Sequence, residues 1–70
     1  MDGDVMAPED FRAELARLGL PHYVAAARMP IHPTQLSRWL WGRDPMPASA
    51  KRRLAQVLEE ERVARQEATP

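Results

Sequence analysis

The polar side chains best suited to recognise a ligand lie close together in the chain, at Thr34, Gln35 and Arg38. With residues placed at about 100° intervals around a helix, Thr34 and Arg38 lie opposite Leu36 and Gln35 lies on the flank. Arginine can donate two hydrogen bonds to guanine, glutamine can pair with adenine, and the threonine methyl can contact the thymine methyl. These residue types at this spacing predict a helix surface that contacts base edges in DNA.

Simpler interpretations of the same residues stay open. Polar residues such as Thr34 and Gln35 are common at helix N-termini because they cap the backbone there. Arg38 is, on this view, a solvated helix residue. Trp41 shares the outer face, where an exposed indole is typical of an interface; the alternative is that it folds over Pro45 or Met46.

The sequence carries no recognisable catalytic or metal-binding pattern. It lacks cysteine, and its two histidines, His22 and His32, are ten residues apart, so a zinc site is not expected. Ser/His/Asp sets, paired carboxylates in a supporting context and glycine-rich phosphate loops are also missing. We therefore expect a protein that is not an enzyme and that uses no metal and no cofactor.

The chain is short and its charges are unevenly distributed. Its 70 residues allow one small domain, without a run of about 18 apolar residues for a membrane span. Net charge is zero, yet residues 1–21 carry two basic against five acidic side chains, residues 22–54 six against one, and residues 55–70 two against four. The cationic middle is typical of a phosphate-binding surface, with the acidic ends facing away. The alternative is that the charges pair within helices.

Prolines and glycines divide the chain into helix-length segments, and no stretch alternates like a strand. We expect helices from Pro8 to before Gly19, from Pro21 to before Pro30, from a His32 cap to Gly42, and from about Ala48 onward. Leu36, Trp39 and Leu40 should form the buried stripe of the third helix. The expected fold is all-α, with four or five short helices.

The segment IHPTQLSRWLWG (residues 31–42), followed by PASAKRRLAQVL (residues 47–58), resembles the Xre-type helix-turn-helix family, which includes lambda-like repressors and Cro proteins. The resemblance extends from about Phe11 to Leu58. It implies a compact four- to five-helix bundle of the lambda-repressor-like type over residues 8–60, with the motif at about 21–42. A flexible acidic N-terminus would occupy residues 1–7, and residues 61–70 would form a helix extension or a disordered tail.

The resemblance also implies site residues and partners. Base contacts would come from Thr34, Gln35 and Arg38, with Pro33 offering apolar contact only. Contacts to the DNA backbone would come from His22, Tyr23, Arg43, Lys51, Arg52 and Arg53. The implied protein is a cytoplasmic, nucleoid-associated regulator of a prokaryote or phage. It would be chiefly a repressor, Cro-like or resembling an autoregulatory antitoxin, and would bind a pseudo-palindromic operator in double-stranded DNA as a homodimer. The alternative is a protein–protein interaction module built on the same fold.

Overall fold

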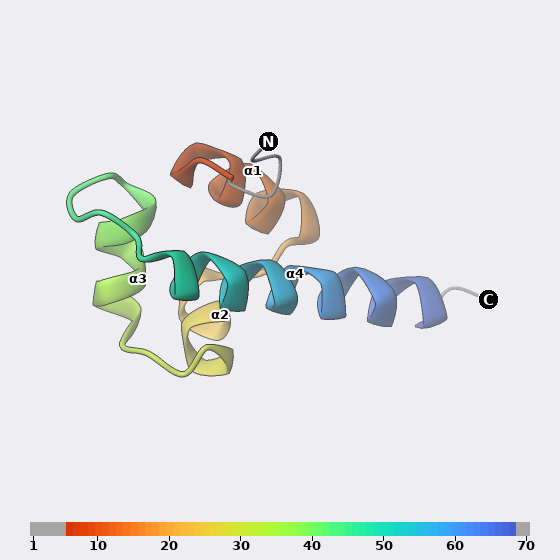
Figure 1. Ribbon diagram of the computed structural model, residues 1–70. Helices are drawn as coiled ribbons and strands as arrows, with labels where there is room; N and C mark the ends of the chain where they lie inside the picture. The colour runs from red at the N-terminus through yellow and green to blue at the C-terminus, as the bar shows by residue number, and fades with distance from the viewer. Residues whose placement is uncertain (1–5, 69–70) are drawn as a thin grey trace.

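The computed structural model describes residues 6–68, which form four helices joined by short loops (Figure 1). The helices are α1 (Pro8–Leu18), α2 (His22–Arg28), α3 (Pro33–Leu40) and α4 (Ala48–Ala68). No strand occurs within residues 6–68, so the expected all-helical class is confirmed. The expectation of a flexible N-terminus falls mainly on residues 1–5, which lie outside the described residues.

The helix ends follow from local backbone chemistry. Gly19 follows α1 with a left-handed φ of 65°, and its N–H donates to the carbonyl of Ala16. At the start of α3, the His32 ring nitrogen Nδ1 accepts a hydrogen bond from the Thr34 backbone N–H at 3.1 Å. Helix α2 ends at Arg28, two residues before Pro30. These boundaries agree with those expected from the proline, glycine and histidine positions.

The four helices surround one apolar core. Helices α3 and α4 each pack against both α1 and α2. The largest fully buried side chains come from α1, α3 and α4: Phe11, Leu15, Leu36, Leu40, Leu54, Val57 and Leu58.

Trp39 departs from expectation, because it is only half-buried and packs against the edge of the core. It lies about 60° around the helix from Leu36. The expectation that Trp39 belongs to the buried stripe is therefore only partly met: the residue packs against the core, but its side chain stays half-buried.

Helix α4 is much longer than the other three helices. Its 21 residues span about 31 Å. Leu54, Val57 and Leu58 are buried, but no side chain from residue 59 to residue 67 is. This end of α4 projects beyond the rest of the bundle (Figure 1). Helix α4 continues through residues 61–68.

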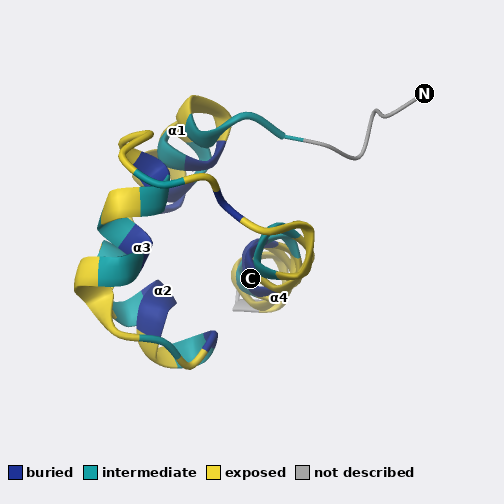
Figure 2. Ribbon diagram, turned by 60° about the vertical axis from the view of Figure 1, so that its left-hand side comes forward, coloured by how far each residue is buried: buried dark blue, intermediate teal, exposed yellow. Residues whose placement is uncertain are grey.

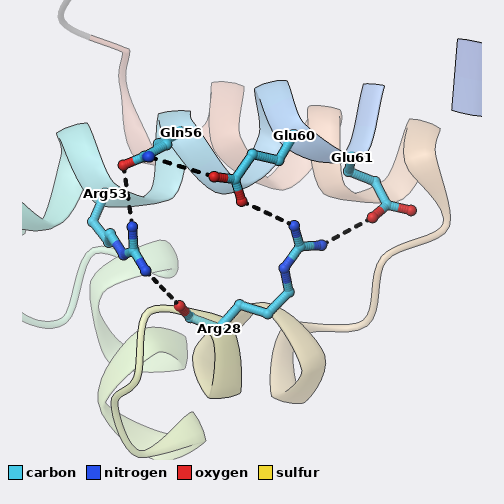
Figure 3. Close-up of polar contacts among 5 residues, drawn as sticks. All are labelled: Arg28, Arg53, Gln56, Glu60 and Glu61. Carbon is cyan, nitrogen blue, oxygen red and sulfur yellow. Dashed lines mark hydrogen bonds and ion pairs between the residues drawn. The ribbon is translucent and has the colours of Figure 1, made fainter. Parts of the chain in front are cut away.

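A polar network joins α2 to α4 (Figure 3). The two Arg28 Nη groups lie 2.9 Å from Glu61 Oε1 and 3.2 Å from Glu60 Oε1. The Arg53 guanidinium donates to the Arg28 carbonyl at 3.2 Å and to Gln56 Oε1 at 3.1 Å. The acidic C-terminal segment therefore neutralises Arg28 of the basic middle segment. The linear charge pattern predicts that the acidic ends face away from the cationic middle, but these ion pairs bring the two segments together.

Candidate functional site

The outer surface of α3 carries an open depression of about 490 Å³. Its lining combines two guanidinium groups, two hydroxyls and an indole, from Thr34, Ser37, Arg38, Trp41 and Arg43. The first four residues follow the i, i+3, i+4, i+7 spacing of one helix face. Leu36 and Leu40 are fully buried on the opposite face. The exposed surface of α3 is turned away from α4 (Figure 2).

The turn after α3 brings two charged residues back toward this face. Gly42 adopts a left-handed φ of 75°, and its N–H donates to the Trp39 carbonyl at 3.2 Å. The Arg43 N–H donates to the Arg38 carbonyl at 2.8 Å, and the Asp44 N–H lies 3.3 Å from the same oxygen. This is the Schellman arrangement, in which a glycine allows the chain to satisfy the last carbonyls of a helix. It fixes where residues 43 and 44 leave the helix.

Arg38 forms an ion pair with the loop that follows its own helix. Its Nε lies 2.9 Å from Asp44 Oδ2, and the two side chains are 55% and 37% exposed. Within residues 6–68, the Nη groups of Arg38 have no hydrogen-bond partner. An exposed pair of this kind contributes little to stability, about 0–1 kcal/mol. The ion pair instead fixes the direction in which the Arg38 guanidinium points.

Trp41 is 60% exposed and is held by a residue from another helix. The guanidinium carbon of Arg12 lies 4.3 Å from the centroid of the Trp41 ring. Arg12 also donates a hydrogen bond to the Leu40 carbonyl, 28 residues along the chain. One face of the indole is therefore occupied by a cation from α1, and Trp41 marks the junction of α1 with the end of α3.

The structure brings together part of the predicted base-contacting set. Thr34 and Arg38 line the depression, whereas Gln35 is half-buried and does not. Pro33 is exposed at the first turn of the helix. Ser37 lines the depression but was not among the predicted contacts. Its signal in the sequence is its spacing, three residues after Thr34 and four before Trp41.

The predicted backbone-contacting residues are distributed over three regions. Arg43 is exposed and lines the depression. His22 is half-buried and Tyr23 is 66% exposed, both at the start of α2. The basic residues of α4 are not brought to the depression. Among them Arg53 contacts Gln56 and α2, while Lys51 and Arg52 make no ion pair within the described part of the chain.

The metal-ligating side chains and the apolar content of residues 6–68 bear on the kind of site. No group of three or more His, Asp or Glu side chains there is arranged to hold a metal ion. No helix in that range combines the length and apolar character needed to cross a bilayer.

Comparisons of the chain with family models, curated proteins and solved structures find no match.

Proposed function

We propose that this protein binds double-stranded DNA through the outer face of α3 and regulates transcription, chiefly as a repressor. The observation that carries the proposal is the depression lined by Thr34, Ser37, Arg38, Trp41 and Arg43. Guanidinium and hydroxyl groups are the donors that major-groove recognition uses. An α-helix with its side chains is about 10–12 Å in diameter, which matches the width of the major groove, about 12 Å.

The link between α2 and α3 supports a helix-turn-helix interpretation. Only residues 29–32 separate the two helices. A connection of three to four residues is typical of this motif, whose second helix enters the major groove. Together with the resemblance of residues 31–42 and 47–58, this supports assignment to the lambda-repressor-like type and the Xre-type family. The domain in this proposal covers residues 8–60.

Contacts to phosphates would surround the base-reading face. Arg43 lies in the turn after α3, where the chain would pass the sugar–phosphate backbone. His22 and Tyr23 at the start of α2, together with Lys51 and Arg52 on α4, would extend these contacts. Phosphate contacts fix the position of a protein on the duplex without reading its sequence.

One domain of this size covers a single half-site. We infer that the functional unit is a homodimer on a pseudo-palindrome, with half-sites about 34–36 Å apart. Such a dimer would repress transcription by occupying promoter DNA and excluding polymerase. Selection of bound sequences from a random duplex pool, using the full chain, should enrich an inverted repeat with this spacing. Recovery of no sequence preference would contradict the proposal.

The base-reading role of Arg38 gives the first specific prediction. Arg38→Ala should relax preference at one position of the selected site, with about 1–3 kcal/mol of discrimination lost. The measurement compares affinities for the selected duplex and for its single-base variants. Arg17→Ala is the control, because it removes the same charge from a 73% exposed side chain on α1. Equal weakening on every sequence would assign Arg38 to phosphate.

A protein-interaction module is the second candidate function. The exposed rings of Trp41 and Tyr23, 60% and 66% accessible, favour it, as does the zero net charge. Salt dependence separates the two functions. Each phosphate neutralised should contribute a slope of about −0.9 in log K against log salt. An affinity for duplex DNA that does not change with salt would favour the interaction module.

A further inference from the structure

We propose that Asp44 is a positioning residue that directs Arg38 toward a guanine and thereby sets base specificity. This inference rests on the proposed DNA-binding function. It adds an acidic residue to a surface whose other charged groups are cationic. The residue lies outside the helix that would contact the bases, in the turn that follows it.

Asp44 is held next to Arg38 at two points. Its carboxylate accepts from Arg38 Nε at 2.9 Å, and its backbone N–H lies 3.3 Å from the Arg38 carbonyl. The left-handed Gly42 and the Arg43 N–H bond to Arg38 fix the path of the turn between them. The carboxylate is therefore placed by the backbone, and the Arg38 side chain adjusts to it.

The pairing leaves the far edge of the guanidinium available. A guanidinium has five N–H donors, one on Nε and four on the two Nη atoms. Asp44 accepts from Nε, and no described residue accepts from the Nη groups. A bidentate contact to guanine O6 and N7 needs two donors from one edge. The pairing of Nε with Asp44 orders the flexible Arg38 side chain before its Nη groups meet the base, which reduces the side-chain entropy lost on binding.

The negative charge of Asp44 has a separate effect. A carboxylate beside the groove-facing surface repels every phosphate backbone, whatever the base sequence. Removing the charge should therefore strengthen binding to random DNA. Loss of the hydrogen bond, by contrast, should weaken discrimination at the guanine alone. The two effects can be separated because Asn and Ala are both neutral, while only Asn keeps an oxygen that can accept from Nε.

The test uses the full chain and three duplexes: the selected site, the same site with the guanine pair replaced, and a random sequence. Asp44→Ala should reduce discrimination against the replaced pair by about fivefold or more, within the range expected of one bidentate contact. Asp44→Asn should keep most of that discrimination. Both variants should bind the random duplex more tightly by the same factor. Glu67→Ala, which removes an exposed charge near the end of α4, should change neither quantity.

Further variants and a melt keep the outcomes distinct. Asp44→Ser, whose hydroxyl is too short to reach Nε, should repeat the loss seen with alanine, and circular dichroism melts should show all variants folded. Discrimination that is equal in the alanine and asparagine variants overturns the positioning role, even if the parent binds DNA sequence-specifically. A parent chain that binds no duplex DNA overturns the proposed function and this inference with it.

Discussion

At the residue scale, Arg12 links two helices that are distant in sequence. Its guanidinium stacks over Trp41, with 4.3 Å to the ring centroid, and donates to the Leu40 carbonyl. The last carbonyls of a helix lack partners within the helix and carry its partial negative charge. A cation from α1 satisfies one of them here. Arg12 therefore helps to hold the end of α3, and with it the start of the turn that carries Arg43.

Arg12→Ala should lower the free energy of unfolding by about 1–2 kcal/mol. An exposed cation–π contact contributes about 0.5–1 kcal/mol, and a hydrogen bond from a charged donor adds a similar or larger amount. Urea unfolding of the full chain measures the change. Arg12→Lys should lose less, because it keeps the charge, and Arg17→Ala should stay within about 0.5 kcal/mol of the parent. An Arg12→Ala variant with the same free energy of unfolding as the parent would show that these contacts of Arg12 contribute nothing to stability.

Arg43→Ala should weaken DNA binding on all sequences alike. Within residues 6–68 the Arg43 side chain has no ion-pair partner, so its charge is available to a phosphate. Loss of one phosphate contact per half-site should reduce the salt slope by about one unit per half-site. Fluorescence anisotropy over a range of salt concentrations measures this slope, with Arg17→Ala again as the control. A change confined to one base position would instead assign Arg43 to base recognition.

At the scale of elements, the end of α3 depends on one glycine. Gly42 has a φ of 75°, and a Cβ built there meets no atom within 4 Å. A side chain at residue 42 would therefore lower stability only through the left-handed backbone conformation, and not through a steric clash. Because the turn also places Arg43 and Asp44, the same glycine controls both charged groups beside the depression.

Gly42→Ala should destabilise the protein by about 1–2 kcal/mol, the cost of a left-handed conformation for an L-residue. Gly42→Asn should cost less, since asparagine adopts this region more readily. Gly19, with a φ of 65° and equally open space, is the matched position. Gly19→Ala should lose similar stability in thermal melts but leave DNA affinity unchanged. If Gly42→Ala kept both stability and affinity, the turn would not be what positions these groups.

Helix boundaries were predictable because proline and glycine act on their own stretch of backbone. Pro8, Gly19, Pro30 and Gly42 each constrain the chain whatever packs around it. The helical period also placed Thr34, Arg38 and Trp41 on the correct face.

Contacts between separate helices could not be predicted in this way. The stacking of Arg12 on Trp41, the partial burial of Trp39 and the hydrogen bond from Arg53 to α2 all depend on how helices meet. A helical pattern defines the faces of one helix but does not identify the neighbour of each face.

At the scale of the whole molecule, folding redistributes the charges seen along the sequence. Most basic side chains make polar or ring contacts within residues 6–68; those that do not are Arg43, Lys51 and Arg52. Arg28, which contributes to the cationic middle segment, is held by Glu60 and Glu61. The charge available to an anionic partner is therefore smaller than the linear count indicates, and it is concentrated near the two ends of the loop between α3 and α4.

Replacing Glu60 and Glu61 together by Gln should leave the positive charge of Arg28 without a carboxylate partner. We expect a loss of about 0.5–1 kcal/mol of stability, as for partly exposed ion pairs, and a tighter affinity for random duplex DNA from the freed cation. Urea unfolding and salt-dependent binding measure the two effects. Glu67→Gln removes a charge from the same helix away from Arg28 and is the control. Unchanged DNA affinity in the double variant would show that Arg28 lies too far from the bound duplex to matter.

The projecting end of α4 makes the protein easy to label or tether. Residues 59–68 extend about 15 Å past Leu58, after which no residue up to residue 67 is buried, and they lead away from α3 (Figure 1). A dye, a reporter domain or a surface linker attached there would be separated from the depression by a stiff helical spacer. Immobilised through this end, the molecules would share one orientation, with α3 directed toward the solution.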